Sequence, residues 1–217
     1  MSYSAFVPLR VFSSYTMLEG AFDPKAIAKT AKARGFPAVA LCDRNGLYAA
    51  MPFSDACFAQ GVQPVIGALV SIARPGSSAI DWLALLAQDE TGYANLCAIV
   101  SDAHLLPEDG AEPHVALASL AGRSEGLICL TGAGEGALAR LLAEGQVPAA
   151  LAYCDELQAL FPERLYIEIA RCGDDVMDAA EAALIDLAYD RNLPLVATNP
   201  CCFAERDFHA AHDALLC

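Results

Sequence analysis

The residues of this sequence that could carry out chemistry lie mainly where short apolar runs end. In parallel α/β proteins, functional side chains gather at the carboxyl ends of the strands. Carboxylates and thiolates at such ends can bind metal ions, and guanidinium groups can pair with carboxylates. The positions concerned are Arg10, Phe12, Ser13, Asp43, Arg44, Leu69, Thr131, 168–172 and 199–202. The four histidines lie elsewhere, at His104, His114, His209 and His212.

Seven short runs rich in Val, Ile and Leu alternate with segments of helical length. The runs are residues 6–12, 38–43, 64–72, 82–87, 126–131, 165–169 and 194–199. The helical segments are residues 24–34, 47–59, 93–104, 135–143, 148–161, 175–191 and 206–217, and residues 105–124 are predicted to form a loop. Strands that alternate with helices predict an α/β fold in which a parallel sheet is covered by helices. Periodicity leaves both an open sheet and a closed barrel possible.

The composition is that of an acidic, well-folded protein. Hydrophobic residues make up 56% of the 217 residues and charged residues 18%, which excludes a disordered chain. Because 13 basic residues face 27 acidic ones, the net charge is −14, and we expect no direct binding of nucleic acid. Lys25, Lys29 and Lys32 all lie in the predicted helix 24–34, which could touch a phosphate backbone but is better interpreted as a solvated face.

Cysteine use and the N-terminus favour the cytoplasm. The nine cysteines are scattered singly except for Cys201 and Cys202, and no basic and apolar leader opens the chain. We therefore expect free thiols, mostly packed as small apolar side chains in a reducing compartment. Residues 56–73 carry no charge, but the polar residues and proline at 60–64 predict that this stretch does not cross a membrane.

Several stretches, in the same order along nearly the whole chain, resemble the PHP (polymerase and histidinol phosphatase) domain family. The resemblance is to the form that opens the alpha subunit of bacterial replicative DNA polymerase III. The stretches are 9–20 (LRVFSSYTMLEG), 38–46 (AVALCDRNG), 63–67 (QPVIG), 83–87, 92–96, 126–132, 165–168, 193–199 and 211–217. The resemblance implies a distorted, TIM-like seven-stranded β/α barrel. It also implies that residues 1–217 are one PHP domain from a much longer polymerase chain, which agrees with the apolar ending at Leu215 and Leu216.

The metal ligands that the resemblance implies are almost all replaced. Relatives with a metal hold two or three divalent ions through His, Asp and Glu at strand ends, where the ions activate water for phosphoester hydrolysis. Of these ligands, Asp43 is retained. The replaced positions are Arg10, Phe12, Arg44, Leu69, Cys172, Pro200 and Cys202, with Trp82 at a less secure match. One carboxylate beside an arginine cannot hold a metal cluster, so no cofactor is expected.

Two function classes follow from the resemblance. In the first, the domain is non-catalytic, braces a DNA-directed DNA polymerase and docks the separate proofreading exonuclease subunit. In the second, it is a metal-dependent phosphoesterase, either a 3′–5′ exonuclease or a pyrophosphatase, working at the barrel mouth. The number of ligands favours the first class, while the exonuclease partner is implied by the family alone.

Two other metal sites remain open as hypotheses. Cys172, Cys201 and Cys202 could form a thiolate zinc site with Asp43, but adjacent cysteines rarely ligate one zinc ion, and buried packing is favoured. The pair His209 and His212 could bind a metal on one helix face, although a packing hydrogen bond is the commoner role for His212.

The arginines that replace histidine predict an internal salt bridge. A buried Asp43 without a partner would cost several kcal/mol, and the planar guanidinium groups of Arg10 and Arg44 suit carboxylates. We expect Arg10 or Arg44 to pair with Asp43, with Glu168 sharing the contact. Arg10 is the better candidate because strand alternation places it on the same face as Phe12.

Overall fold

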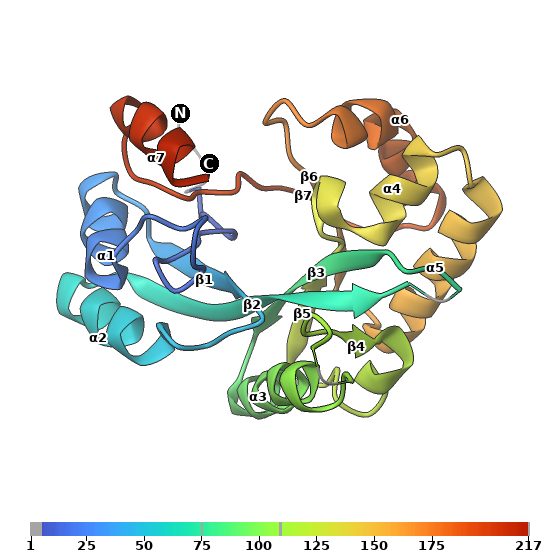
Figure 1. Ribbon diagram of the computed structural model, residues 1–217, viewed down its shortest axis with the longest axis horizontal. Helices are drawn as coiled ribbons and strands as arrows, with labels where there is room; N and C mark the ends of the chain where they lie inside the picture. The colour runs from blue at the N-terminus through green and yellow to red at the C-terminus, as the bar shows by residue number, and fades with distance from the viewer. Residues whose placement is uncertain (1–5, 75, 109, 217) are drawn as a thin grey trace.

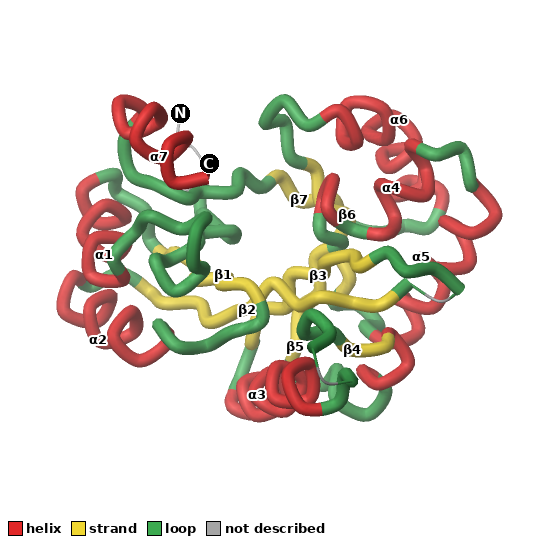
Figure 2. The backbone as a smooth tube through the Cα atoms, in the orientation of Figure 1, coloured by secondary structure: helices red, strands yellow, loops and turns green. Residues whose placement is uncertain are grey.

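The computed structural model describes residues 6–74, 76–108 and 110–216, which form a strongly curled sheet with helices outside it (Figures 1 and 2). The sheet has seven strands in the order β1-β2-β3-β5-β6-β7, with β4 beside β2. The strands are β1 (Ala38–Arg44), β2 (Gln63–Ala73), β3 (Ile80–Ala87), β4 (Val115–Ala116), β5 (Leu127–Leu130), β6 (Leu165–Ile169) and β7 (Leu195–Ala197). The mixed α/β architecture and the curled seven-stranded sheet confirm the predicted fold class.

The helices form largely where the sequence predicts them. They are α1 (Pro24–Ala33), α2 (Ala50–Gln60), α3 (Glu90–Leu105), α4 (Ala137–Ala143), α5 (Val147–Leu160), α6 (Asp175–Asp190) and α7 (His209–Leu216). Helix α1 shows why: the Asp23 side chain accepts hydrogen bonds from the first-turn amides, and Pro24 opens the helix where no amide donor is needed. No helix among the described residues is long and apolar enough to cross a membrane, and the uncharged stretch 56–73 is divided between α2 and β2.

The expectation of an all-parallel sheet is wrong at β3. This strand runs antiparallel to both of its neighbours, β2 and β5. Only residues 74–79 join β2 to β3, and the Arg74 amide donates to the Ala79 carbonyl across this turn. A parallel crossover needs about a dozen residues or more, so a connection this short forces a hairpin.

The predicted first strand, residues 6–12, is a bridging segment and not a regular strand. Val11 forms single bridges to Leu41 on one side and to Cys201 on the other. Backbone amides of Ala40 and Cys42 donate to this segment, and it exchanges two hydrogen bonds with Cys201. The segment therefore links β1 to the chain that follows β7, and the edges of the curled sheet meet through it. The strand that completes the count is β4, inside the predicted loop 105–124.

Strand alternation divides the core into the interior of the barrel and two outer layers. The interior layer holds Phe12, Leu69 and Leu130 among its members. One outer layer lies between α1, α2 and β1, and a larger one lies under α3 to α6. In β1, Ala40 and Cys42 face the interior while Val39 and Leu41 pack against the helices. This alternation decides which side chains can meet inside the barrel.

Gly92, in the first turn of α3, provides a test of this packing. A Cβ atom there would lie 1.8 Å from the backbone oxygen of Gly126. Although alanine favours helix by about 1 kcal/mol, we expect Gly92→Ala to lower the free energy of unfolding by about 1–3 kcal/mol, because the backbones must separate. Urea denaturation measures the change. Thr91→Ala, at the exposed neighbouring position, is the control and should change stability by less than about 0.5 kcal/mol. A stabilised Gly92→Ala variant would contradict this packing.

Candidate functional site

Arg10, Phe12, Arg44 and Trp82 gather on the interior side of the barrel mouth. Phe12 belongs to the interior layer, with Trp82 packed against it. The Arg44 guanidinium lies 4.5 Å from the ring centroid of Trp82 and 5.4 Å from that of Phe12. The positive charge of Arg44 therefore lies over two aromatic rings and is attracted to their π electrons.

The centre of this site is the carboxylate of Glu135, which binds both arginines. Arg10 Nη2 lies 2.6 Å from Glu135 Oε2, and Arg44 Nη2 lies 2.5 Å from Glu135 Oε1. Arg44 also forms a two-point contact with Glu19, at 2.5 Å from Nε and 2.9 Å from Nη2. We call Arg10, Arg44, Glu19, Glu135 and Glu168 the mouth ion cluster.

Glu168 forms the buried end of the mouth ion cluster. Its Oε1 accepts from the Thr198 hydroxyl and lies 3.5 Å from Arg10 Nη1, while its Oε2 accepts from the Gly132 amide at 3.0 Å. Both Arg10 (1% exposed) and Glu168 (0%) are shut off from solvent. The predicted contact between Arg10 and Glu168 is therefore present, as a long and fully buried pair.

The predicted salt bridge to Asp43 is wrong. Asp43 accepts hydrogen bonds from the Ser13 amide and hydroxyl, both at 2.6 Å, and from the Thr16 hydroxyl at 2.8 Å. Neither Arg10 nor Arg44 is among its partners. Asp43 and Arg44 are adjacent in β1, so their side chains leave opposite faces of the strand, and Arg44 is the one that turns inward. Asp43 instead fixes the loop that follows Phe12.

The charges of the cluster favour its ionised form. Burial by itself works to raise the pKa of Glu135, but the positive charges of Arg44 and Arg10, and their hydrogen bonds, hold that pKa below its usual value. Burial works to lower the pKa of Arg44, and the contacts with Glu19 and Glu135 raise it instead. The arginines and Glu135 thus remain charged at neutral pH.

The other positions where relatives are expected to hold metal carry no suitable donors. Leu69 is fully buried in the interior layer, and Cys172 is exposed after β6. Pro200 and Cys202 are partly buried in the chain after β7, where Cys202 packs against the interior layer.

The thiols are poorly suited to zinc. Burial raises the pKa of Cys201 above the ordinary value and that of Cys202 to about 12. Cys172 is mostly exposed, and partial desolvation together with the negative charge of Asp174 raises its pKa as well. Zinc binds the thiolate, so these groups would have to lose a proton against this shift. In the described part of the chain, no group of three or more His, Cys, Asp or Glu side chains is placed to hold a metal ion.

The carboxylates at the mouth are likewise engaged by protein donors. Both oxygens of Asp43 and both of Glu168 accept hydrogen bonds from the chain, and guanidinium groups stand beside Glu168 and Glu135. A divalent cation would have to displace these donors and lie next to fixed positive charges. The residues present do not fit a metal cluster.

The histidines have structural contacts. His212 is buried, donates from Nε2 to the Glu19 carbonyl and packs 4.8 Å from the ring centroid of Phe203. His209 meets the same phenylalanine edge-on. The packing role expected for His212 is therefore the one observed, and it ties α7 to the loop that carries Glu19.

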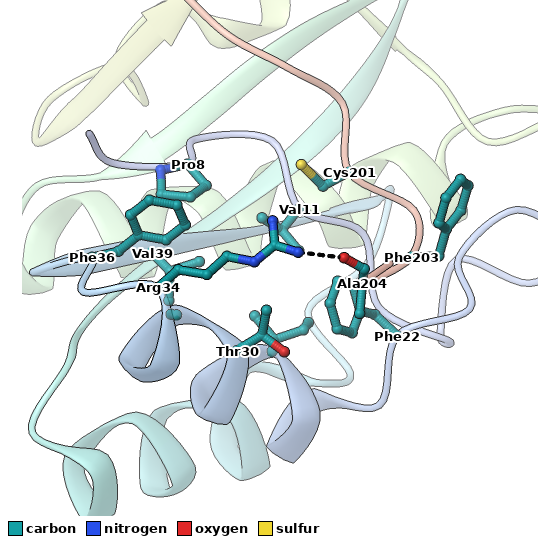
Figure 3. Close-up of a pocket in the computed structure, with 12 residues that line it drawn as sticks. Pro8, Val11, Phe22, Thr30, Arg34, Phe36, Val39, Cys201, Phe203 and Ala204 are labelled. Carbon is teal, nitrogen blue, oxygen red and sulfur yellow. Dashed lines mark hydrogen bonds between the residues drawn. The ribbon is translucent and has the colours of Figure 1, made fainter. Parts of the chain in front are cut away.

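A small apolar cavity of about 50 Å³ lies outside the barrel, between α1, β1 and residues 201–204 (Figure 3). Phe22, Val11 and Phe203 contribute to its walls, and Arg34 crosses it to donate to the Ala204 carbonyl at 2.6 Å. The space is about that of one or two water molecules. It is a packing defect beneath α1 and too small for a substrate.

Three partners in the site were missed from the sequence: Glu19, Glu135 and Thr198. Glu135 lies in the glycine-rich turn after β5, at the start of the predicted helix 135–143. The turn is tight, with φ of +85° at Gly132 and +48° at Ala133. The available signal was an acidic residue in the turn that follows a strand end, the region where functional side chains gather.

Comparison with known proteins now identifies the family. Residues 8–172 match the family model described as the PHP domain. The chain belongs to the PHP domain family. It is 42% identical to the DNA polymerase III subunit alpha of Caulobacter vibrioides, over 98% of this chain and 19% of that protein. The same subunit of Treponema pallidum is 34% identical, over 100% and 19%, and that of Escherichia coli 33%, over 98% and 18%. The chain thus spans about a fifth of the length of these relatives.

A solved structure shares the fold of this PHP domain. It is described as an amidohydrolase from Chromobacterium violaceum with bound sulfate and no metal, and it matches with a TM-score of 0.58 at 15% identity. The match covers 97% of each chain. At this identity, the comparison supports the barrel-like fold and says nothing of the site.

Replacing Arg10 tests the cluster. In Arg10→Met, buried Glu168 keeps only neutral donors and Glu135 keeps one arginine, so we expect the free energy of unfolding to fall by about 3–5 kcal/mol. The matched control is Arg171→Met, which breaks the exposed pair with Glu181 and should leave the free energy of unfolding nearly unchanged, because exposed ion pairs contribute little. Chemical denaturation measures both. Equal effects of the two substitutions would show that the Arg10 contacts are not needed for stability.

The lowered pKa of Glu135 predicts a defined pH dependence. The ionised carboxylate stabilises the fold above the pKa of an unfolded glutamate, about 4.3, and this contribution is lost as the pH falls through the lower folded pKa. The stability difference between the wild type and Glu135→Gln should therefore be full at pH 6–7 and shrink below about pH 4. Denaturation across this range measures it, with Glu156→Gln on the exposed side of α5 as the control. A difference independent of pH would contradict the assignment.

Proposed function

We propose that this chain is a metal-free PHP domain of a DNA polymerase III alpha chain, serving DNA replication as a structural and subunit-docking module. The observation that supports this most strongly is the mouth ion cluster. Two arginines occupy the barrel mouth, and the acidic side chains around them are engaged as their partners. A phosphoesterase of this family would need carboxylates and imidazoles free to bind metal there.

The cluster suits a bracing role. Through Glu135 it joins Arg10 in the first segment to Arg44 at the end of β1, and through Glu168 it reaches β6. Glu19 extends the network to the loop on which α7 packs through His212. Five separate parts of the chain, including the turn that carries Glu135, are thus joined to one another by protein groups alone.

The proposed partners are the rest of the polymerase alpha chain and the proofreading exonuclease subunit. Both come from the likeness to polymerase alpha subunits, which carry the DNA-directed DNA polymerase activity in this proposal. The net charge of −14 argues against direct DNA binding by this domain. Because bacterial DNA replication takes place in the cytoplasm, the proposed function implies a cytoplasmic location.

The competing function is a metal-dependent phosphoesterase at the mouth, acting as a 3′–5′ exonuclease or a pyrophosphatase. It requires at least one divalent ion with an open coordination position for water. Two measurements on the purified 217-residue chain distinguish the structural module from the phosphoesterase. The first is its metal content, and the second is its hydrolysis of phosphoesters in the presence of Mn²⁺.

We expect no stoichiometric metal and no hydrolysis above the buffer control. We also expect no shift in Tm when Mn²⁺ is added. A specific site would bind the ion in the folded state, and at 100 times its Kd the ion would add about 2.7 kcal/mol of stability and raise the Tm. A metal-dependent phosphoesterase serves as the positive control. Bound metal together with hydrolysis that EDTA abolishes would overturn the proposal.

A further inference from the structure

Helix α7 rests on the rest of the domain through a single buried side chain. Of its residues His209–Leu216, only His212 is buried, at 8% exposed. The ring Nε2 of His212 donates to the Glu19 carbonyl at 2.6 Å. Among the described residues, this is the one hydrogen bond that joins α7 to the barrel. A helix attached in this way can leave without opening the apolar core, so α7 belongs to the least stable part of the structure.

The chain that leads into α7 is loosely attached as well. The ring of Phe203 packs on His212, with 4.8 Å between the ring centroids, so the two side chains move together. From outside this stretch, the half-exposed Arg34 donates to the Ala204 carbonyl at 2.6 Å. The small apolar cavity of about 50 Å³ lies next to this stretch (Figure 3). Residues 203–216, which we call the C-terminal latch, therefore form a unit with few contacts to the barrel.

The C-terminal latch joins the barrel at a well-held point. The Cys202 carbonyl accepts from the Ala21 amide at 2.8 Å, and Cys201 exchanges two hydrogen bonds with the segment around Val11. These contacts close the curled sheet. A displacement of the latch would therefore turn about the bonds after Cys202 and leave the sheet intact.

The loop that α7 contacts holds a strained turn at Leu18. This residue has φ of +69°, in the left-handed region that a leucine rarely adopts. Its side chain is 73% exposed and that of Met17 is 83% exposed, so packing does little to stabilise the turn. The Thr16 carbonyl closes the turn by accepting from the amides of Glu19 and Gly20. Strain of this kind persists only where neighbouring contacts hold the backbone in place.

Glu19 provides such contacts on two sides. Its carbonyl accepts from His212, and its carboxylate binds Arg44 at 2.5 Å from Nε and 2.9 Å from Nη2. Arg44 in turn binds Glu135 and lies 4.5 Å from the ring centroid of Trp82. Because both contacts act on one residue of a strained turn, the loss of either lets the turn relax and weakens the other. Helix α7 and the mouth ion cluster are thus connected through a single residue.

We propose that the C-terminal latch has a docked and a released position, and that its docking holds Glu19 against Arg44 in the mouth ion cluster. When His212 leaves Glu19, the turn relaxes, the two-point contact with Arg44 is lost, and Arg44 shifts toward its remaining partner Glu135. A ligand that binds α7 in only one of these positions thereby changes the barrel mouth, and a change at the mouth alters the docking of α7 by the same coupling free energy. The inference concerns motion within the domain and does not depend on the proposed docking function.

Hydrogen exchange of the 217-residue chain, followed by NMR, tests the latch. We expect His212→Ala to accelerate exchange about tenfold or more in α7 and at the amides of Glu19 and Gly20, because the hydrogen bond that docks the helix is lost. The amides of β2 should stay slower than all of these. The matched control is His209→Ala, at an exposed position of the same helix, which should change each rate less than about twofold.

The fluorescence of Trp82, the only tryptophan of the chain, reports on the mouth in the same variants. In His212→Ala, quenching of Trp82 by acrylamide should rise, because Arg44 no longer covers its ring in the same way. His212→Gln keeps a donor that can reach the Glu19 carbonyl and should restore most of the protection and the low quenching. Circular dichroism and Tm verify that each variant is folded.

A substitution at the mouth tests the coupling in the reverse direction. Glu19→Gln removes the charge that binds Arg44 and keeps the backbone carbonyl that accepts from His212. We expect it to accelerate exchange in α7 several-fold, although the carboxylate binds Arg44 and not the helix. The control is Glu205→Gln, which breaks an exposed pair with Arg34 at the start of the latch and should change the rates less than about twofold.

Three results would overturn the latch. In the first, His212→Ala accelerates exchange in α7 and leaves the amides of Glu19 and Gly20 and the quenching of Trp82 unchanged, so that α7 is only a peripheral helix. In the second, the amides of α7 in the wild type open only together with those of β2. In the third, Glu19→Gln leaves exchange in α7 unchanged, which would show that the mouth and the helix are independent.

Discussion

The carboxylate of Glu135, held between Arg10 and Arg44, is the interaction on which the barrel mouth depends. Arg10 is buried, and a buried guanidinium is tolerated only when carboxylates and carbonyl groups surround it. Glu135 and Glu168 provide this environment from two different strand ends. The arrangement of charged side chains at the barrel mouth thus follows from the need to neutralise the buried guanidinium of Arg10.

In the proposed function, this arrangement takes over the role that metal ions have in a hydrolytic barrel. A metal cluster draws acidic side chains from several strands toward central positive charges, and here the two guanidinium groups do the same. The difference lies in the chemistry that remains. A metal offers an open position for water and lowers its pKa, whereas an arginine with its N–H groups pointed at carboxylates offers neither. We propose that a barrel organised in this way keeps its shape without metal and serves as a docking module.

Two layers of the molecule meet at β1. The mouth ion cluster fixes the strand ends from inside the barrel, while α1 and α2 pack on the outside of the sheet. Both depend on β1, whose alternate residues pack inward against Phe12 and outward against α1 and α2. The inner cluster thus supports the strand on which the outer helices rest.

The sequence by itself determined most of the local structure and the family. Apolar runs, the Asp23 cap and Pro24 were enough to place six of the seven strands and the helices, because these signals act over a few residues. The collinear stretches predicted the PHP fold. Alternation correctly placed Arg10 beside Phe12 on the interior face.

Only the tertiary structure decided which charges meet. Glu135 is 125 residues from Arg10 in the chain, and no local pattern couples them. The same holds for Asp43, which pairs with hydroxyl groups because its strand turns it away from the arginines. The short connection between β2 and β3 is a local signal for the direction of β3. The pairing of β3 with β5, in contrast, joins segments that are distant in the sequence. Such contacts depend on how the sheet curls and on which side chains then share the interior, and these are properties of the whole chain.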